Sequence, residues 1–250
     1  MTAHIPVGLQ LFSVRDDCRA DLAGKLNAVA DMGYACIETA GLYDHPVSTW
    51  REVLNDCGIR AVGAHVGLDG VAPDTLAETV DTYASLGCDT LVVPALGAAY
   101  RESIDGYKRA AERINAAAEK LPADMRMGYH NHAFEFEAVD GQVPYDVLLS
   151  EFSDSVLLQY DFGWLYRAGQ DGVAMVNAHP GRQQTVHIKA YKADDETAVV
   201  GEDDVPWPAV FEACEANGGT AVYIVEHERY ADAPLVCVRQ CRDHLRAMGK

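Results

Sequence analysis

Three short phrases of the same form, DMGY, DCGI and SLGC, set the plan of the chain. Each follows an amphipathic helical pattern and precedes an apolar run that is typical of a buried strand. Their glycines, Gly33, Gly58 and Gly87, suit the left-handed backbone that ends a helix. They lie 25 and then 29 residues apart, which is the length that one strand, one helix and two loops require. The repeat therefore predicts alternating strands and helices around a parallel sheet.

Following this unit along the chain gives eight predicted strands. They are VGLQLF (7–12), ACIETA (35–40), IRAVGAHV (59–66), TLVVPA (90–95), MRMGYHN (125–131), VLLQYD (156–161), TVHIKAY (185–191) and VYIVEHE (222–228). Helices are predicted between them, with Asp21, Ser48 and Asp74 as N-terminal caps, and a last helix at 232–247. No Gly/Ser-rich or Pro-rich linker interrupts the pattern, so we expect one domain over residues 1–250.

Eight alternating units in 250 residues predict an α/β fold, the (β/α)8 TIM barrel. A doubly wound open sheet is the alternative. The chain lacks both the GxGxxG fingerprint that such a sheet uses for dinucleotides and the Walker A sequence.

Composition argues against several classes of partner. The 49% hydrophobic content is enough for a buried core, while the formal net charge of −18 disfavours both nucleic acid and an anionic membrane surface. No signal peptide or membrane-spanning segment is expected from the apolar patterning. Seven cysteines without a CxxC motif fit reduced thiols, so a cytoplasmic location is expected.

Polar side chains follow nearly every predicted strand, where a TIM barrel carries its chemistry. They are Gln10, Glu38, His65, His130, His132, Asp161, His187, Lys189, Glu226, His227 and Glu228. A single polar strand end is most often merely solvated. The same feature at so many strands indicates a convergent ring of carboxylates and imidazoles, which is the arrangement of a metal-assisted active site.

Several motifs resemble the sugar isomerase/epimerase family with xylose isomerase-like barrels, which includes tagatose epimerases, hydroxypyruvate isomerases, inosose isomerases and inosose dehydratases. The resemblance spans nearly the whole chain. It lies in VGLQLFSVRDD, GYACIETAGLY and AHV at the first three strands, and in YHNHAFEFE, QYDFGWLYRAGQD, TVHIKAYK and IVEHERY further on. The last motifs are the most specific.

This resemblance implies one divalent metal ion held by strands five to eight. Three of its ligands fall on Asp161, His187 and Glu226. At strand five many relatives read Glu-Asn-His, whereas this chain reads HNH, so His130 is the expected fourth ligand and His132 the alternative. Mn²⁺ is the favoured ion, with Zn²⁺, Co²⁺ and Mg²⁺ as alternatives.

Seven side chains are expected to contact the substrate: Gln10, Glu38, His65, His132, Glu135, Trp164 and Lys189. Glu135 takes the place of a carboxylate that touches substrate hydroxyls in the epimerases. Trp164 stands where epimerases often have a substrate-binding histidine, and its ring suits the C–H face of a cyclic sugar or polyol. Lys189 keeps the His-x-Lys pattern of the family and should reach substrate oxygens.

The implied activity is that of a metal-dependent isomerase or epimerase acting on a keto-sugar or related polyhydroxy carbonyl compound through an enediolate. Glu226 is the expected base, with His130 or Glu135 on the opposite face. The alternative is a dehydratase or lyase that eliminates a beta group from an inosose or 3-keto-glycoside, because inosose dehydratase-like members also have a histidine-rich strand five.

Two other functions are less favoured. An endonuclease IV-like enzyme would need a three-metal cluster and a basic surface, which the acidic composition opposes. A non-catalytic sugar-binding barrel would bind no metal. A small-molecule partner is therefore expected, with no nucleic acid and no membrane, and a homo-oligomer is compatible with the family.

Overall fold

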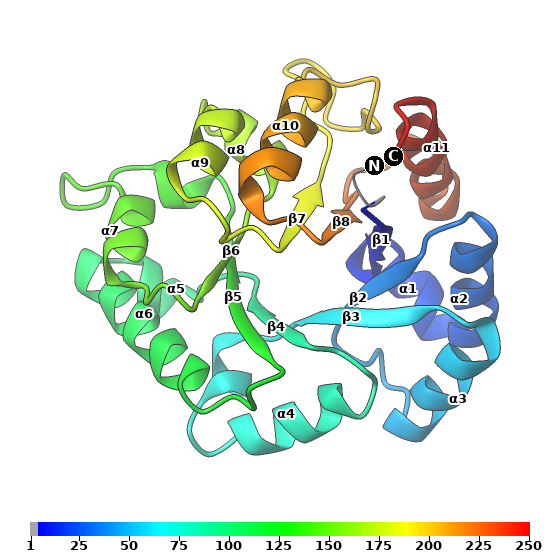
Figure 1. The fold of residues 1–250 in the computed structure, drawn as a ribbon, viewed down its shortest axis with the longest axis horizontal. Helices are drawn as coiled ribbons and strands as arrows, with labels where there is room; N and C mark the ends of the chain where they lie inside the picture. The colour runs from blue at the N-terminus through cyan, green and yellow to red at the C-terminus, as the bar shows by residue number, and fades with distance from the viewer. Residues whose placement is uncertain (1–4) are drawn as a thin grey trace.

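The computed structural model describes residues 5–250, and within them eight parallel strands form a nearly closed barrel surrounded by helices (Figure 1). The sheet order is β6-β5-β4-β3-β2-β1-β8-β7. The strands are β1 (Val7–Gln10), β2 (Cys36–Ala40), β3 (Arg60–His65), β4 (Thr90–Val93), β5 (Arg126–His130), β6 (Leu157–Gln159), β7 (Thr185–Ile188) and β8 (Val222–Val225). The predicted TIM barrel is confirmed. Its extent as one domain over residues 1–250 stays a prediction, since residues 1–4 lie outside the described part.

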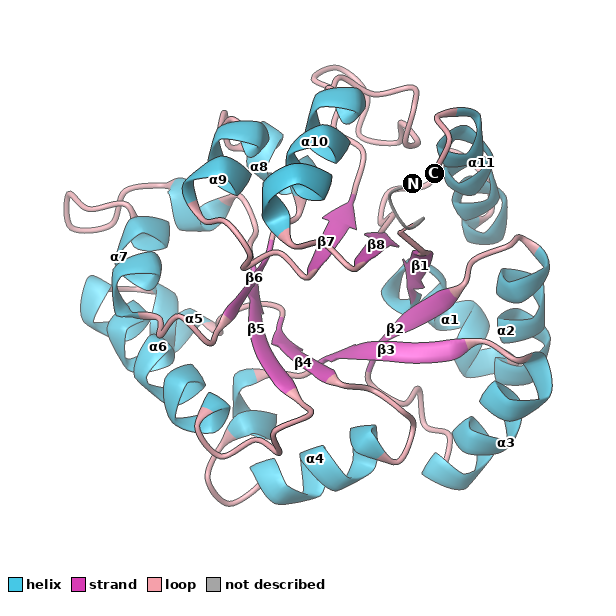
Figure 2. Cartoon of the chain, in the orientation of Figure 1, coloured by secondary structure: helices cyan, strands magenta, loops and turns pink. Residues whose placement is uncertain are grey.

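The helices form the outer ring of the barrel (Figure 2). They are α1 (Arg15–Ala20), α2 (Leu22–Asp31), α3 (Val47–Cys57), α4 (Leu76–Ala84), α5 (Ala98–Arg101), α6 (Ile104–Ala118), α7 (Pro144–Glu151), α8 (Phe162–Arg167), α9 (Gly172–Ala178), α10 (Trp207–Ala213) and α11 (Pro234–Ala247). Short 3-10 turns η1 (Leu11–Val14), η2 (Leu68–Val71) and η3 (Phe134–Phe136) follow β1, β3 and β5, and the π-helical turn η4 (Cys214–Gly218) follows α10.

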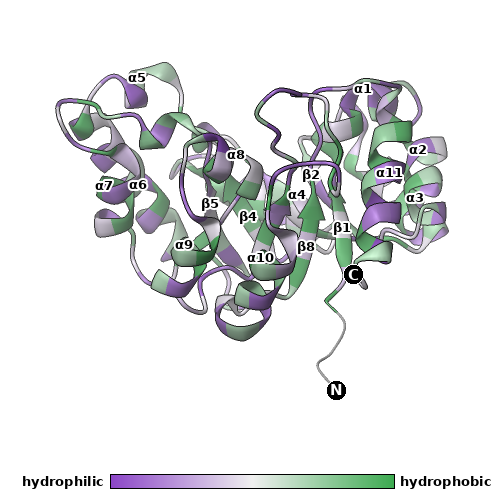
Figure 3. Cartoon of the chain, turned by 90° about the horizontal axis from the view of Figure 1, so that it is seen from above, coloured by the Kyte–Doolittle hydropathy of each residue, from purple (hydrophilic) through white to green (hydrophobic). Residues whose placement is uncertain are grey.

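Apolar burial on both sides of the strands explains the continuous apolar runs in the sequence. Every residue of β1, β4, β7 and β8 is buried, as expected for a parallel sheet covered by helices. The helices bury one face each; α2, for example, buries Leu22, Leu26 and Val29. In Figure 3 strands such as β8 are accordingly mainly green (hydrophobic), while the helices alternate in hydropathy.

The barrel closes at a seam between β6 and β7. These strands share no continuous ladder; an isolated parallel bridge joins Asp161 to His187. The backbone N–H of His187 donates to the carbonyl oxygen of Tyr160 at 2.8 Å. Two of the expected metal ligands are therefore the residues paired across the seam.

Helix ends follow the predicted pattern in part. Gly33, Gly58 and Gly87 have positive φ values of 81°, 67° and 87°, as predicted. The carboxylate of Asp21 accepts from the backbone N–H of Gly24 and caps α2.

The other two predicted caps are wrong. Pro46 precedes α3 and Thr75 precedes α4, and neither residue makes a side-chain cap hydrogen bond. Ser48 falls inside α3, and Asp74 lies one residue before the Thr75 cap position.

Most predicted strands are too long at their carboxyl ends. β1 stops at Gln10, whose side-chain oxygen accepts from the backbone N–H of Phe12 and turns the chain into η1. β5 stops at His130 and β6 at Gln159. The polar residues after these strands lie in loops rather than on continued strands, which changes the direction of their side chains.

Across residues 5–250, we find no helix with the length and apolar character needed to cross a membrane.

Gly163 lets the start of α8 lie directly against the chain that leaves β7. A Cβ atom at this position would lie 2.8 Å from the carbonyl oxygen of Lys189 and 3.0 Å from that of Ala190. Both neighbours are backbone atoms, so neither can rotate away. A glycine is therefore required for Asp161 and Lys189 to keep their relative positions.

We expect Gly163→Ala to lower the free energy of unfolding by about 1–3 kcal/mol, the usual cost of overpacking. Gly67→Ala is the matched control, because its φ is −59° and its Cβ would meet no atom within 4 Å. It should change stability by less than about 1 kcal/mol. Urea unfolding of both variants measures this, and equal stabilities would contradict the steric argument.

Candidate metal centre and active site

Four side chains from the carboxyl ends of β5 to β8 converge at one point. His130 ends β5, Asp161 follows β6, His187 lies in β7 and Glu226 follows β8. All four are buried, and their ligand atoms lie within 4.8 Å of one another. These are the four residues that the sequence predicts as metal ligands.

His187 lies at the centre of the group. Its Nδ1 is 3.0 Å from Oε2 of Glu226 and 3.8 Å from Oδ2 of Asp161. The same Asp161 oxygen is 3.9 Å from Nε2 of His130. Oδ1 of Asp161 accepts from the backbone N–H of Trp164 at 2.9 Å, which fixes the carboxylate in place.

The donor set suits a divalent cation. Oδ2 of Asp161 is buried and has no hydrogen-bond partner within residues 5–250, and the same holds for Nδ1 of His130. A buried, unpaired carboxylate oxygen is costly unless a positive group satisfies it. Two carboxylates and two imidazoles are suitable ligands for Mn²⁺, Zn²⁺ or Co²⁺.

Charge balance in the buried site leads to the same conclusion. Glu38, Asp161 and Glu226 are buried carboxylates, and Lys189 is the buried cation among them. Lys189 is itself shared with the partly exposed carboxylate of Glu228, at 2.9 Å. The carboxylates therefore outnumber the cation, and a divalent cation would reduce the excess negative charge.

Without a bound cation, protons supply the compensation. Burial raises the pKa of Asp161 to about 7. Burial alone would lower the pKa of His187, but the carboxylates of Glu38 and Glu226 raise it to about 10. Lys189 and His187 outweigh burial and hold the pKa of Glu226 below its usual range. Without a bound cation, Asp161 and His187 therefore carry protons that a metal ion would displace.

The strand-five histidines are kept neutral. Burial, followed by the neighbouring imidazoles, holds the pKa of His130 well below its usual value, and burial lowers the pKa of His132 to about 4. A neutral imidazole can coordinate a metal or accept a proton. Nε2 of His130 is the atom that faces Asp161, while Nδ1 of His130 and Nδ1 of His132 have no hydrogen-bond partner in the described chain.

Glu38 and Gln10 occupy a different place from the one expected. Both are buried inside the barrel, and Nε2 of Gln10 donates to Oε2 of Glu38 at 2.7 Å. Nε2 of His187 contacts the same oxygen at 2.6 Å, and Nε2 of Gln159 donates to Oε1 at 2.7 Å. Protein groups contact both carboxylate oxygens of Glu38, and the expected substrate contacts of Glu38 and Gln10 stay predictions.

Glu135 also departs from the expectation. Its carboxylate is fully buried and accepts from the hydroxyl of Tyr129 at 2.7 Å and from the backbone N–H of His132 at 2.8 Å. β5 has already ended, and η3 turns the side chain back toward the strand. Burial raises the pKa of Glu135 to about 7. The residue fixes the loop that carries His132.

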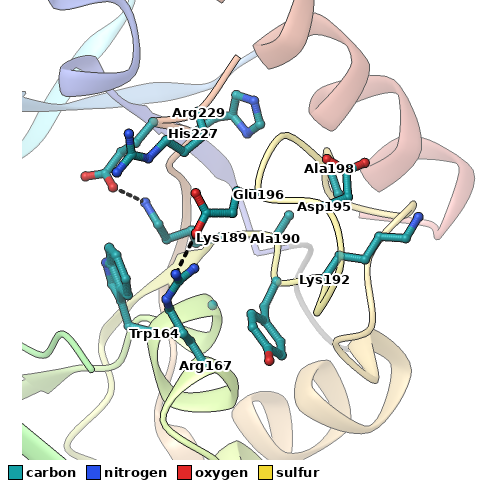
Figure 4. Close-up of a pocket in the computed structure, with 13 residues that line it drawn as sticks. Trp164, Arg167, Lys189, Ala190, Lys192, Asp195, Glu196, Ala198, His227 and Arg229 are labelled. Carbon is teal, nitrogen blue, oxygen red and sulfur yellow. Dashed lines mark hydrogen bonds and ion pairs between the residues drawn. The ribbon is translucent and has the colours of Figure 1, made fainter. Parts of the chain in front are cut away.

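Trp164 and Lys189 line a pocket (Figure 4), and Lys189 connects it to the candidate metal ligands through Glu226, at 3.8 Å. Nζ of Lys189 lies 5.2 Å from the centre of the Trp164 ring and 2.9 Å from Oε2 of Glu228. The ring of His132 lies 5.3 Å from the Trp164 ring. Their expected role in substrate binding stays a prediction, and the geometry is compatible with it. Across this pocket, Arg167 pairs with Glu196 at 2.6 Å.

His65 and Gln159 complete the interior of the site. Nε2 of His65 contacts Oε1 of Gln159 at 2.8 Å and Oε2 of Glu38 at 3.1 Å. Gln159 is fully buried and also donates to Thr185. Sequence reasoning missed Gln159, although a glutamine inside the apolar run VLLQYD was a usable signal.

Comparisons with known proteins identify relatives of this chain. The family model described as xylose isomerase-like TIM barrel matches residues 26–248. Inosose dehydratase from Geobacillus kaustophilus is 25% identical over 199 residues, which make up 68% of this chain and 62% of the length of that protein.

Solved structures show the same architecture. A sugar phosphate isomerase/epimerase from Parabacteroides distasonis has a TM-score of 0.84 and 25% sequence identity. The match covers 97% of this chain and 98% of that protein's chain. A protein described as a "probable 3-DHS dehydratase" from Bacillus anthracis has a TM-score of 0.74 and 14% identity, covering 97% of this chain and 99% of its own. The latter similarity shows the fold alone.

We expect the affinity for Mn²⁺ to rise with pH, because the ion competes with protons on Asp161 (pKa about 7) and His187 (pKa about 10). Between these two values one proton is released, so the affinity should rise about tenfold per pH unit; below pH 7 the dependence should be steeper. Calorimetric titrations in buffers of different ionisation enthalpy count the released protons.

Asp161→Asn should bind Mn²⁺ more weakly and lose the steeper part of the pH dependence. Asp105→Asn changes an exposed aspartate on α6 and serves as the control. An affinity that does not change with pH would contradict the charge balance described above.

Proposed function

We propose that this chain, which belongs to the xylose isomerase-like TIM barrel family, is a metal-dependent isomerase or epimerase of a keto-sugar or a related polyhydroxy carbonyl compound. The observation that supports this most is the buried group of His130, Asp161, His187 and Glu226, with ligand atoms within 4.8 Å. It lies at the carboxyl ends of the strands, where TIM barrel enzymes carry their active sites.

The residues present fit the reaction class. A divalent cation held by these four side chains would polarise a substrate carbonyl oxygen. This would lower the pKa of the neighbouring C–H group. Glu226 is the base on one face: Lys189 and His187 keep it ionised, and both contact its Oε2, which leaves Oε1 to accept the proton alpha to the carbonyl. Loss of that proton gives an enediolate.

A neutral imidazole serves the opposite face. Of the two groups that the sequence offers there, Glu135 is occupied by Tyr129 and by the backbone of His132. His130 stays available, and His132 lies closer to the mouth, where it is partly exposed. An epimerase returns the proton to the opposite face of the carbon, and an isomerase returns it to the neighbouring carbon.

Substrate binding is assigned to Trp164 and Lys189. The Trp164 ring offers a flat apolar face next to His132, suited to the C–H side of a sugar or polyol. Lys189 is buried between the carboxylates of Glu226 and Glu228, at 3.8 and 2.9 Å. Its ammonium group can donate to a substrate hydroxyl without leaving these partners, because it has three N–H donors.

We expect Glu226→Gln to slow the entry of solvent deuterium at the alpha carbon of a substrate by at least about 100-fold, since removing a general base costs this much or more. Proton NMR of a panel of keto-sugars and inososes in D2O measures the exchange. Glu212→Gln, an exposed glutamate on α10, should exchange like the unchanged protein.

Metal content is measured in both Glu226 and Glu212 variants, because Glu226 is also an expected ligand. Loss of exchange with the ion still bound supports the role of Glu226 as the base. Unchanged exchange in Glu226→Gln refutes it.

A dehydratase is the second candidate, and two observations favour it. His130 stands where many isomerases and epimerases of this family have a glutamate, so this face of the substrate has an imidazole in place of a carboxylate. The curated relative that matches this chain at 25% identity is an inosose dehydratase. The same enediolate can expel a beta hydroxyl, and a histidine that has taken up a proton can donate it to that leaving group.

Product mass separates the two reactions. Isomerisation and epimerisation conserve the mass of the substrate, whereas dehydration removes one water. We expect conserved mass with a keto-sugar; a product lighter by one water, formed from an inosose or 3-keto-glycoside, would establish the dehydratase instead. Mass spectrometry of reactions run with Mn²⁺, with the Glu226→Gln protein as the blank, gives the answer.

A further inference from the structure

Glu38 is the carboxylate of the site with the most hydrogen bonds, and it is not one of the expected metal ligands. It lies in β2, with 1% of its surface exposed. Oε2 contacts Nε2 of His187 at 2.6 Å, Nε2 of Gln10 at 2.7 Å and Nε2 of His65 at 3.1 Å. Oε1 accepts from Nε2 of Gln159 at 2.7 Å. Four nitrogen groups from four different strands therefore surround one buried carboxylate.

The directions of these bonds are fixed by Gln159. Its Nε2 donates both to Glu38 and to the hydroxyl of Thr185, so its Oε1 is the atom that faces His65. An amide oxygen can only accept, and Nε2 of His65 therefore carries a hydrogen. The glutamine amides and His65 all present hydrogens to Glu38, as an ionised carboxylate requires.

The same logic fixes His187. A carboxylate that already accepts from Gln10 and Gln159 can only accept from His187, so Nε2 of His187 carries the hydrogen. Nδ1 is then the nitrogen that an ion can take: it faces Glu226 at 3.0 Å and Asp161 at 3.8 Å, and an ion bound there would displace the hydrogen that Nδ1 shares with Glu226. When a metal-binding histidine donates its distant N–H to a carboxylate, the hydrogen bond orients the ring and makes the other nitrogen a better ligand.

His187 belongs to two groups of side chains that have the geometry to hold an ion. One is His130, Asp161, His187 and Glu226; the other is His65, His130 and His187. The distance of 2.6 Å between Nε2 of His187 and Oε2 of Glu38 is that of a direct hydrogen bond and leaves no room for an ion between the two atoms. Glu38 thus opposes use of the three-histidine group through Nε2.

We propose that Glu38 is a positioning residue that holds His187 with its hydrogen on Nε2 and directs Nδ1 to a single metal ion shared with Asp161, Glu226 and His130. Gln10, Gln159 and His65 hold Glu38 for this task. The inference rests on the proposed metal dependence and adds to it a determinant of affinity and of the ion's position.

The first test measures metal affinity rather than turnover. Glu38→Gln is expected to raise the dissociation constant for Mn²⁺ or Zn²⁺ by on the order of 10- to 100-fold, the usual effect of removing such a partner. Competition with a chromophoric chelator gives the constant, and thermal unfolding in excess chelator shows whether the variant is folded. An unchanged constant in a folded variant overturns the proposal.

A charge-swapped variant separates a direct hydrogen bond from a general charge effect. Gln10→Glu combined with Glu38→Gln keeps the net charge and the hydrogen bond between the two side chains, but it moves the carboxylate away from His187. We expect the weak affinity of Glu38→Gln to persist. Recovery of the original affinity would show that only the buried charge matters, and would overturn the positioning role.

A measurement on the unchanged protein does not depend on any variant folding. In ¹⁵N-histidine NMR spectra with bound Zn²⁺, His187 should carry its hydrogen on Nε2 and the metal on Nδ1, with one ion bound per chain. The opposite assignment, or two ions per chain, overturns the proposal. If no ion binds at all, the proposed metal-dependent function fails as well, so the two failures are distinguishable.

Discussion

The site depends on the need to neutralise buried carboxylates inside a barrel that is otherwise apolar. Glu38, Asp161 and Glu226 are all within the barrel mouth and buried, where an uncompensated charge would cost several kcal/mol. His187 contacts all three, through Nε2 on one side and Nδ1 on the other. The glutamine amides donate hydrogen bonds to these carboxylates, and Lys189 supplies a positive charge beside them.

The histidine at position 130 fits the same constraint. A glutamate there would add a further negative charge to a group that already has three, and two positive charges from one ion together with Lys189 would not balance it. The third of these buried carboxylates is Glu38 in β2, which contacts His187 at 2.6 Å. His130 therefore adds no further negative charge to the site, and burial keeps its imidazole neutral. This links the electrostatics of the interior to the choice between an epimerase and a dehydratase.

The sequence was enough to predict the barrel and the convergence of His130, Asp161, His187 and Glu226, because parallel strands place their carboxyl ends together. It was not enough to tell which polar strand ends face a ligand and which face one another. Glu38 and Gln10 were predicted as substrate contacts, yet they bond within the barrel, and Gln159 was overlooked as part of that network. The family resemblance assigns Glu135 to substrate contact, whereas its carboxylate lies in η3 and accepts from Tyr129 and from the backbone of His132. Such contacts arise between strands far apart in sequence, and no local pattern encodes them.

The candidate site lies at the seam between β6 and β7, where the barrel closes. Seven of the eight strand boundaries are ladders of paired residues, but this one is held by a single bridge, and its two members are Asp161 and His187. Whatever links the side chains of these two residues also fastens the first and last strands of the sheet order to each other. The candidate metal ligands thus lie at the strand boundary with the fewest backbone hydrogen bonds, so an ion held by Asp161 and His187 would also join the two ends of the sheet and close the barrel.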